Sequence, residues 1–471
     1  MNKYVTTAIP YVNGVPHIGH AVDYCLADTA ARYLRLRGND VRFQVGTDEH
    51  GGKIFQKAAE LNIPVKEYVD QNSAAFRNFI DKLKISYTDF IRTTDESHIK
   101  RCQEIWRRLS DHIYLASYEG WYCTGCERFV TEKECKENHG VCPDHQKPYE
   151  KIQEENYYLR ISDFKDQIRE KIENDELLIL PDFRKKEILK LLDDSPDVSI
   201  SRPREQLKWG VEVPGDESQV MYVWIDALSN YITVLGYPEQ DISAWWPAAV
   251  QFVGKDILRF HAIIWPAMLL GLGLPLPKVI VSHGMILANG QKMSKSIGNV
   301  VDPNEVIEKH GLEAFRYFFL RHIDTFVDSD FTWDKFEEAY NNELANDLGN
   351  LVQRLATLAQ KNEIQILDAA AKLEPSGDYC KLMDEFEFSK AFDYVWEKVQ
   401  NLNKRIDEEK PWMLAKNGER EKLEDCLKSL ILDLLQVNLE LMPFLPEVSA
   451  QITKVFADPI TPPSVPLFPK N

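Results

Sequence analysis

The beginning of the chain carries the pattern that most restricts how it can fold. An apolar run over Tyr4–Ile9 predicts a short buried strand, and Pro10–Pro16 predicts a turn. Gly19–Arg37 then predicts a helix. A buried strand that leads through a tight turn into a helix is the repeating unit of an open α/β sheet. We therefore predict an α/β fold from this segment.

Two histidines lie at the start of the predicted helix, in the string Pro16-His17-Ile18-Gly19-His20. Residues three apart share one helix face, and the free N–H groups at a helix N-terminus favour phosphate. Gly19 has no side chain to keep a nucleotide away from the backbone. On their own, two such histidines are more typical of packing or of helix capping than of catalysis.

A second string, Lys292-Met293-Ser294-Lys295-Ser296, follows two strands predicted over Lys278–Val281 and Met285–Ala288. Asn289-Gly290 predicts a tight turn that leads into a loop over Lys292–Gly298. Two lysines on a mobile loop can close over a triphosphate and stabilise the charge that develops as pyrophosphate leaves. On its own, a loop of lysine and serine is most often solvated surface.

Together the two strings resemble the HIGH and KMSKS boxes, the paired ATP-binding signatures of class I aminoacyl-tRNA synthetases. The resemblance implies a doubly wound parallel-sheet, or Rossmann-type, α/β catalytic domain. It also implies that the carboxylate of an amino acid attacks the α-phosphate of ATP, with Mg²⁺ accompanying the nucleotide. The catalytic residues that it assigns are His17, His20, Lys292 and Lys295, of which Lys295 is the better candidate for the leaving pyrophosphate.

Further strings between residue 8 and about residue 412 resemble those of the methionyl-tRNA synthetase family. They are Ala8–Tyr11, Gly46–Gly51, Tyr222–Ala227, Phe252–Ile257 with Phe260-His261, and Lys410–Trp412. The resemblance implies a methionine–tRNA ligase, which forms methionyl-adenylate and pyrophosphate from L-methionine and ATP. The methionine would then pass to the 3′ end of methionine-accepting tRNA, both initiator and elongator.

The same resemblance assigns side chains to methionine. A thioether is soft and weakly polar, so its recognition needs a shaped aromatic and aliphatic pocket with few hydrogen bonds. Taken singly, each aromatic residue here is more typical of a core. Asp48 would hold the α-ammonium group, and it follows a strand predicted over Val41–Val45, at the strand end where open α/β sheets bind ligands. The expected pocket consists of Ile9, Trp224, Tyr231, Ile257, Phe260 and His261, with Tyr11 as the donor near sulfur.

The resemblance also assigns the ATP contacts. Gly254 and Asp256 would contact the ribose, and Arg202 would help in the phosphate region. Gly19 and Lys295 complete the expected ATP site.

Cysteine spacing favours a metal site over disulfides. Cys123-x2-Cys126 and Cys142-x2-His145, separated by fifteen residues, have a spacing close to that of zinc ribbons. Zinc binds thiolate and imidazole in a closed tetrahedral set, and such a site is structural. We expect one zinc ion on these four side chains, with Cys135 as the alternative to His145.

The strings also suggest a division of the chain. We expect residues 1–114 and 221–275 to form the two halves of the catalytic domain, and 115–220 to be a connective insertion with the zinc knuckle. Residues 276–330 would be a connecting segment with the KMSKS-like loop, and 331–471 a C-terminal α-helical bundle. Apolar residues three and four apart support that bundle: Leu344, Leu348, Leu351, Val352, Leu355 and Leu358.

The family resemblance makes this bundle the anticodon-binding domain, with Asn350, Arg354 and Trp412 as the anticodon readers. An amide and a guanidinium can pair with base edges, and an indole can stack on an unpaired base. For Trp412, packing inside the bundle is the alternative.

Composition bears on location and assembly. No apolar run reaches the roughly 20 residues of a membrane-spanning helix. The chain opens at Met1, directly before a predicted strand, which leaves no room for a signal peptide, so we expect a cytoplasmic protein. It ends at Asn471, soon after the predicted bundle, so we expect a monomer. The net charge of −18 does not favour tRNA binding, although Arg184–Lys186 and Arg202–Arg204 could form a local basic track.

Other functions are also compatible with parts of the sequence. Class I synthetases for leucine, isoleucine or valine generally carry a much larger insertion, and a cysteine enzyme would place zinc in its active site. A nucleotidyltransferase of the wider HIGH superfamily would lack the helical bundle. A zinc-dependent RNA-binding protein would leave His17, His20 and Lys295 without a task.

Overall fold

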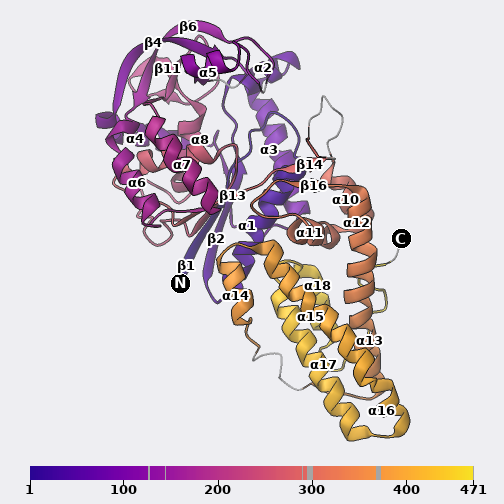
Figure 1. The fold of residues 1–471 in the computed structure, drawn as a ribbon. Coiled ribbons are helices and arrows are strands. Elements are labelled where there is room, and N and C mark those ends of the chain that lie inside the picture. Colours follow the sequence, from indigo (N-terminus) through magenta and orange to yellow (C-terminus); the bar gives the residue numbers. More distant parts are fainter. Residues whose placement is uncertain (126–127, 144, 289, 294–300, 367–372, 470–471) are drawn as a thin grey trace.

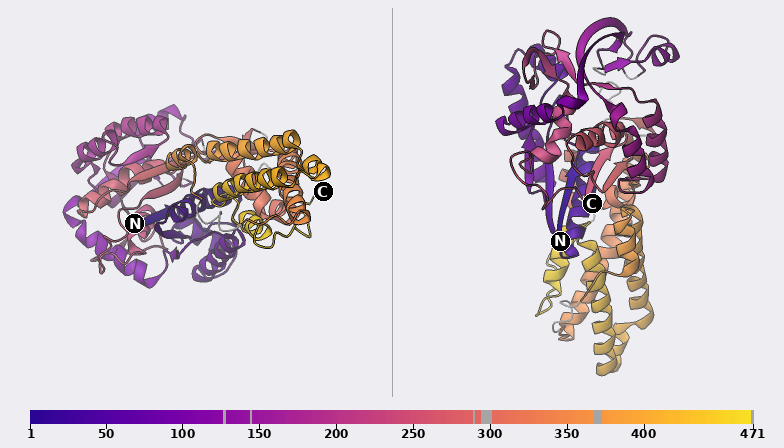
Figure 2. Two further views of the ribbon diagram at one scale, coloured as in Figure 1. Left: turned by 90° about the horizontal axis from the view of Figure 1, so that it is seen from below. Right: turned by 90° about the vertical axis from the view of Figure 1, so that its left-hand side faces the viewer.

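The computed structural model describes residues 1–125, 128–143, 145–288, 290–293, 301–366 and 373–469. Figure 1 shows a rounded α/β body and, extending away from it, a set of long helices from the second half of the chain. The two further views in Figure 2 show the same elongated arrangement. The predicted order, an α/β body followed by a helical region, is confirmed.

A six-stranded parallel sheet forms the centre of the body, in the order β3-β2-β1-β12-β13-β7. Its strands are β1 (Asn2–Thr7), β2 (Asp40–Thr47), β3 (Asp89–Arg92), β7 (Leu178–Leu180), β12 (Val250–Gly254) and β13 (Val279–His283). From β1 the chain adds β2 and β3 on one side, and the later strands lie on the other side. The strand order therefore reverses beside β1, and ligands of doubly wound sheets bind at the carboxyl ends of the strands there.

The helices of the first half cover this sheet. The first helix, α1, agrees with the predicted Gly19–Arg37 to within one residue at each end, whereas β1 ends before the predicted Ile9. Ala8 and Ile9 leave the sheet and line a cavity instead. These helices are α1 (Ile18–Leu36), α2 (Gly52–Glu60), α3 (Val65–Lys82), α4 (Glu96–Arg108), α8 (Val223–Thr233), the π-helix η3 (Phe260–Ile264) and α9 (Trp265–Gly271).

The segment 115–220 contains most of a four-stranded sheet, β5-β4-β6-β8, and a three-stranded one, β10-β11-β9. It also supplies β7 to the central sheet, where Leu178 pairs with Val279. The predicted boundaries of the insertion thus cut through the sheet, because a three-residue strand is too short to show a periodic pattern. Its elements are β4 (Ile113–Cys123), β5 (Arg128–Val130), α5 (Glu132–Glu137), β6 (Glu150–Leu159), α6 (Lys165–Glu173), α7 (Asp182–Asp194), β8 (Val198–Ser199), β9 (Ser201–Pro203), β10 (Glu212–Val213) and β11 (Asp216–Met221). Two short 3-10 turns, η1 (Ser110–His112) and η2 (Ile161–Asp163), flank β4 and β6.

A small sheet in the order β15-β14-β16 and two helices connect the body to the bundle. They are β14 (Ile286–Ala288), β15 (Gln291–Lys292), α10 (Pro303–His310), α11 (Leu312–Arg321) and β16 (Ser329–Phe331). The fully buried Arg316 of α11 donates to Asp28 of α1 at 2.8 Å and to the carbonyls of Pro443 and Phe444 at 3.1 and 2.7 Å. One buried cation therefore joins α1, α11 and the segment that follows α17.

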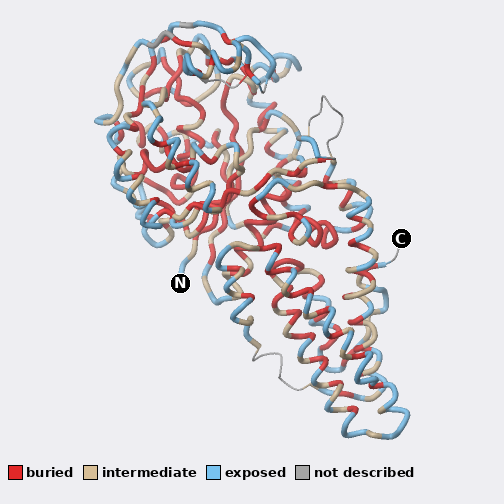
Figure 3. The backbone as a smooth tube through the Cα atoms, in the orientation of Figure 1, coloured by how far each residue is buried: buried red, intermediate tan, exposed pale blue. Residues whose placement is uncertain are grey.

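The helical region consists of α12 (Trp333–Ala339), the π-helix η4 (Tyr340–Gly349), α13 (Asn350–Lys361), α14 (Gly377–Asp384), α15 (Phe388–Glu409), α16 (Pro411–Asn417), α17 (Arg420–Leu441) and α18 (Pro446–Val455). The predicted apolar stripe from Leu344 to Leu355 is buried, with Leu358 half-buried against it. Figure 3 shows buried positions continuing from the sheet through α11 into the bundle, and they form one connected core. Among the helices described, none combines the length and the apolar character needed to cross a membrane.

Candidate active site

A cavity of about 770 Å³ opens at the carboxyl ends of β1 and β12, where the strand order reverses. Its walls come from the residues after β1, the start of α1, the segment after β2, α8, and the segments after β12 and β13. Most of the residues predicted from the sequence for methionine and ATP line it. These are Ile9, Tyr11, His17, Gly19, His20, Asp48, Trp224, Tyr231, Gly254, Asp256, Ile257, Phe260 and His261.

The two histidines of the first string form the N-terminus of α1. His17 is the N-cap residue: its Nδ1 accepts from the Gly19 N–H at 3.2 Å, and the His17 N–H donates to His20 Nδ1 at 3.2 Å. The two rings stack with their centres 3.7 Å apart. A Cβ on Gly19 would lie 3.1 Å from the His17 ring, so glycine allows this compact arrangement. Helix capping and cavity lining are therefore both present here.

The position of His20 also fixes its protonation state. Burial and the neighbouring His17 hold the pKa of the His20 imidazole well below its usual value of 6.5. His20 is therefore neutral at pH 7, with one ring nitrogen able to donate and one able to accept. A neutral ring at a helix N-terminus can donate a hydrogen bond to phosphate while it accepts the capping bond.

Aromatic side chains form the opposite wall. The rings of Trp224 and Phe260 stack with centres 3.8 Å apart and planes only 5° from parallel. Tyr231 and His261 lie behind them, and both are almost fully buried. These four side chains come from α8 and from the π-helix η3, a type of helix often found at functional sites.

The tautomer of His261 follows from its two partners. Its Nδ1 lies 3.0 Å from the carbonyl oxygen of Ile257, which can only accept, so Nδ1 carries the proton. Its Nε2 then accepts from the Tyr231 hydroxyl at 2.8 Å. Burial lowers the pKa of His261 to about 4, so the ring stays neutral at pH 7. The Tyr231 hydroxyl is consequently oriented toward a fixed acceptor.

The segment after β2 brings Asp48 to the cavity. A parallel bridge pairs Tyr11 with Asp48. The Asp48 N–H donates to the Pro10 carbonyl at 2.9 Å, and the Val12 N–H donates to the Asp48 backbone carbonyl at 3.0 Å. Gly51 has a φ of +122°, and a Cβ there would lie 1.8 Å from the Tyr11 hydroxyl oxygen. The loop that carries Asp48 and the loop that carries Tyr11 therefore fit together only with glycine at position 51.

Polar residues that were not predicted also lie on the cavity wall, among them Lys53, Asp23 and His283. His283 Nε2 lies 3.1 Å from Asp23 Oδ1. Burial opposes the charged form of His283, but its contact with Asp23 outweighs burial and raises the pKa of the imidazole. Asp23 lies three residues after His20 on α1, so helix spacing could have predicted it. His283 ends β13, and its place at the carboxyl end of a sheet strand was the corresponding signal.

Other predicted residues lie elsewhere or outside the described residues. Arg202 is buried away from the cavity lining, donates to Ser199 Oγ and the Ser201 carbonyl, and lies over the Tyr222 ring. Its predicted role near the phosphates stays a prediction. Lys292 belongs to β15, and Lys295 lies outside the described residues.

Of the predicted metal ligands that the structure describes, Cys123 ends β4, and Cys142 and His145 lie between α5 and β6, in the turn enclosed by the Val141–Pro148 bridge. The ligand atoms of Cys123, Cys142 and His145 are all within 4.8 Å of one another, and Cys142 Sγ is 3.5 Å from His145 Nδ1. Cys126 lies outside the described residues. Cys135 packs in the same small core but does not belong to this group of three.

The predicted anticodon readers gather at one end of the bundle, which we call the bundle tip (Asn350, Arg354 and Trp412). Asn350 and Arg354 are one turn apart on α13, and the Arg354 guanidinium lies 5.7 Å from the centre of the Trp412 ring on α16. Trp412 is 40% exposed, so part of its indole surface is open to solvent. Figure 1 shows α16 at the end of the bundle farthest from the sheet.

Comparisons with known proteins agree with this geometry. The sequence model of the family described as tRNA synthetases class I (M) matches residues 3–356. A Thermotoga maritima protein named methionine–tRNA ligase is 39% identical over 471 residues, covering 96% of this chain and 75% of the relative. A protein of the same name from Caldanaerobacter subterraneus subsp. tengcongensis is 41% identical, covering 94% and 72%. The solved structure of Mycobacterium tuberculosis methionyl-tRNA synthetase in complex with methionyl-adenylate is similar with a TM-score of 0.89 at 33% identity, covering 99% of both chains.

Proposed function

The chain belongs to the methionyl-tRNA synthetase family of class I aminoacyl-tRNA synthetases, and we propose that its cavity is where L-methionine reacts with ATP. The enzyme is a ligase: it forms methionyl-adenylate and pyrophosphate and then transfers methionine to tRNA. The observation that carries the site assignment is that residues predicted for both substrates, from distant parts of the sequence, line one cavity.

The aromatic wall is the proposed methionine site. Trp224 and Phe260 offer flat apolar surface to the thioether, and Tyr231 with His261 closes the pocket behind them. Asp48, on the opposite wall, supplies a carboxylate for the α-ammonium group. This division of apolar and charged groups suits a substrate that is apolar at one end and charged at the other.

The start of α1 is the proposed ATP site. Free N–H groups, the helix dipole and the neutral imidazole of His20, which can donate, all favour negative charge at this position. Gly254 ends β12 and Asp256 lies two residues further on the same cavity wall, where the ribose would lie. ATP brings Mg²⁺, and Lys292 and Lys295 of the KMSKS-like loop would stabilise the phosphates as pyrophosphate leaves.

We propose one structural zinc ion at Cys123, Cys126, Cys142 and His145. The mutual spacing of the three described ligand atoms suits a tetrahedral zinc, which holds sulfur at about 2.3 Å. Zinc would fix the hairpins of this module, whose own core contains few side chains. Metal analysis of the purified protein should find one zinc ion per chain, and Cys142→Ser should release it; zinc retained in that variant would overturn the assignment.

At the bundle tip we propose contact with the tRNA anticodon. Arg354 and Trp412 present a guanidinium beside an exposed indole, which together offer a stacking surface for an unpaired base. Asn350 adds an exposed amide on the same side of α13. The monomeric state and the cytoplasmic location stay predictions, the first of which sedimentation would test.

The test of the proposed reaction is exchange of labelled pyrophosphate into ATP, measured with each of the twenty amino acids and without tRNA. We expect exchange with methionine alone. Exchange with another amino acid would overturn the pocket assignment, and no exchange by folded, zinc-loaded protein would overturn the proposed function. His20→Asn is the matched variant, because asparagine keeps a capping acceptor but lacks the ring, and it should reduce exchange without lowering the melting temperature.

A further inference from the structure

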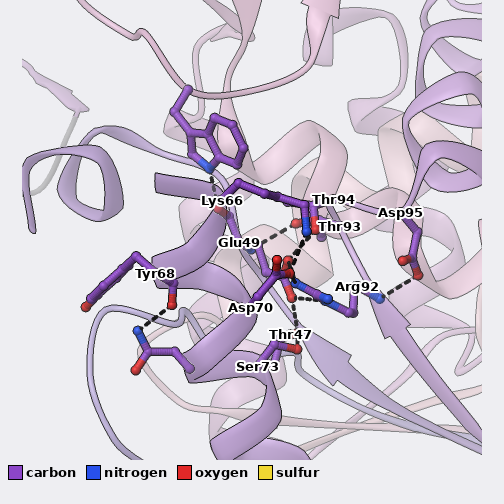
Figure 4. A network of polar contacts seen from close by, with 12 residues as sticks. Thr47, Glu49, Lys66, Tyr68, Asp70, Ser73, Arg92, Thr93, Thr94 and Asp95 are labelled. Carbon is purple, nitrogen blue, oxygen red and sulfur yellow. Dashed lines mark hydrogen bonds and ion pairs between the residues drawn. The ribbon is translucent and has the colours of Figure 1, made fainter. Parts of the chain in front are cut away.

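A buried carboxylate lies directly beside the proposed ammonium-binding Asp48. Glu49 is fully buried, and its two oxygens accept four hydrogen bonds. Oε1 accepts from Arg92 Nε and the Thr47 hydroxyl, both at 2.7 Å. Oε2 accepts from a second Arg92 nitrogen at 2.8 Å and from the Thr94 hydroxyl. Figure 4 shows this arrangement, which we call the Glu49 network (Thr47, Glu49, Asp70, Arg92 and Thr94).

We propose that the Glu49 network and the adjoining His50–Asp226 pair are positioning residues for methionine recognition, acting through Asp48. This inference rests on the proposed function, because Asp48 must bind the ammonium group for its position to matter. It names a role for Glu49, Arg92, His50 and Asp226, none of which is proposed to touch the substrate.

The first argument is the backbone on each side of Asp48. Thr47 accepts from the Thr93 N–H at 3.2 Å, and the Glu49 N–H donates to the Thr93 hydroxyl at 2.9 Å. Successive residues of an extended segment point to opposite sides. Because the Thr47 hydroxyl donates to the Glu49 carboxylate, these two side chains lie on one face, so the side chain of Asp48 between them points to the other face, toward the cavity that it lines.

The second argument is charge. Two adjacent carboxylates at the end of one strand would repel each other and compete for the same ammonium group. The Arg92 guanidinium donates to both carboxylate oxygens of Glu49 and also contacts Asp70 at 2.6 Å, and Asp70 pairs with Lys66. Negative and positive side chains therefore alternate from the interior to the surface, and their charges sum to zero; in order they are Glu49, Arg92, Asp70 and Lys66. Glu49 is thus satisfied internally, and Asp48 is the carboxylate offered to the substrate.

The third argument is that the loop with Asp48 is hydrogen-bonded to α8, the helix that carries Trp224 of the proposed methionine site. His50 Nδ1 lies 2.7 Å from Asp226 Oδ2, with both side chains buried. Asp226 is on α8, two residues after Trp224. The Trp209 indole donates to the Glu49 carbonyl at 2.6 Å, and the Gly51 N–H donates to the Trp209 carbonyl at 3.0 Å. The loop with Asp48 and the helix with Trp224 are consequently held at a fixed separation.

The chain contains a matched control for a merely structural role. Arg42 and Asp89 join the same two strands, β2 and β3, at their opposite ends, again through two hydrogen bonds at 2.8 and 2.7 Å. The side chain of Arg42 is 25% exposed and that of Arg92 is 26% exposed. If these pairs only hold the strands together, substitutions in either pair should have similar consequences.

The experiment compares methionine with desamino-methionine, the analogue in which hydrogen replaces the α-amino group. The KM for methionine and KM for ATP come from pyrophosphate exchange, and the analogue's inhibition constant comes from competition in the same assay. The variants are Asp48→Asn, Glu49→Gln, Arg92→Lys, the double variant of Asp48 and Glu49, and the control Asp89→Asn.

We expect Glu49→Gln to raise the methionine KM about tenfold or more, the loss typical of one charge-assisted contact. Its KM for ATP and the analogue's inhibition constant should stay within about twofold, and Arg92→Lys should be intermediate. The double variant should be no worse than Asp48→Asn alone, because the network acts through Asp48. Asp89→Asn should lower the melting temperature without changing discrimination between methionine and the analogue.

Three outcomes would each overturn the inference. Glu49→Gln could weaken binding of methionine and of the analogue equally, or the effects on methionine KM could add in the double variant. The third is that Asp89→Asn reduces discrimination between the two ligands as much as Glu49→Gln does. If Glu49→Gln does not fold, Thr94→Val removes one donor to the same carboxylate and is judged by the same ratio, with a smaller expected loss. If Asp48→Asn instead kept the wild-type discrimination between methionine and the analogue, the proposed ammonium site would be overturned, so the two failures are distinguishable.

Discussion

At the cavity, polar side chains are held by partners from distant parts of the chain, whereas the bundle tip exposes three side chains from two neighbouring helices. Glu49 is bound by Arg92 and Thr94, more than forty positions away, and His50 by Asp226. Arg354 is held by Asp407 at 2.7 Å and lies beside the exposed Trp412. A small substrate needs its binding groups fixed before it arrives, because each misplaced group costs affinity. An unpaired base can instead be met by surface side chains that order on contact.

This comparison predicts that substitutions in the two regions affect different reactions. The largest effect is expected for Lys295→Ala. Pyrophosphate exchange should fall by roughly two orders of magnitude or more, because a cation that meets charge in the transition state is lost. The KM for methionine should change little, since this lysine is not part of the methionine site.

Lys309→Ala is the matched control, a partly exposed lysine on α10 that pairs with Glu337. It should leave exchange unchanged. A parallel rise in the methionine KM with Lys295→Ala would remove Lys295 from its assigned role.

The junction between the two regions gives the next prediction. Burial raises the pKa of the Glu313 carboxyl to about 7, against which Arg316 and the Val448 N–H favour the charged form. Between pH 4.5 and 7 the unfolded chain has lost this proton while the folded chain keeps it, so stability falls as pH rises through this range. Above pH 7 the reduction in the free energy of unfolding is constant, and it is about 3 kcal/mol if the whole pKa shift contributes.

Glu313→Gln should therefore raise the melting temperature by a few degrees at pH 8 and change it little near pH 4.5, where the folded carboxyl is protonated and the unfolded one is about half protonated. The pH 8 gain should appear without a change in pyrophosphate exchange, because Glu313 belongs to α11, contacts α18 and does not line the cavity. Melting curves of the two proteins at both pH values test this, and an equal gain at both would contradict the pKa assignment.

A smaller loss, confined to tRNA, is expected at the bundle tip. Trp412→Ala should reduce tRNA charging by about tenfold, since stacking of one base on an aromatic ring contributes roughly 1–3 kcal/mol. Adenylate formation should be unaffected. Met413→Ala is the matched control, because Met413 is the next residue and is similarly exposed, 41% against 40%. If charging and exchange fell together, Trp412 would have a structural role instead.

Much of the site could be predicted because its sequence signals are local. The strand, turn and helix that place His17 and His20 are consecutive, and α1 was predicted to within one residue. The order of strands was not predictable in the same way. Whether the short β7 pairs with β13 depends on tertiary contacts between Leu178 and Val279, which no periodic pattern records.

Side-chain partners were the least predictable part. Arg202 was expected near the phosphates from the family resemblance, and that role stays a prediction, but its contacts with Ser199, Ser201 and the Tyr222 ring could not be read from the sequence. The Glu49 network was not expected at all, since its arginine comes from β3, far along the chain. Motifs show which residue types a site needs, whereas the groups that orient them depend on the packing of distant elements.

The smallest effect is expected from Asp407→Asn, which removes the charge paired with Arg354 at the bundle tip. The two side chains are 38% and 66% exposed, and such surface ion pairs contribute about 0–1 kcal/mol. tRNA charging should therefore change by less than about threefold, whereas Glu49→Gln, which alters a buried pair of the same kind, should change methionine recognition about tenfold. Charging and exchange rates of both variants at matched salt concentration provide the measurement. A tenfold loss from Asp407→Asn would mean that the tip is as rigidly ordered before binding as the cavity is.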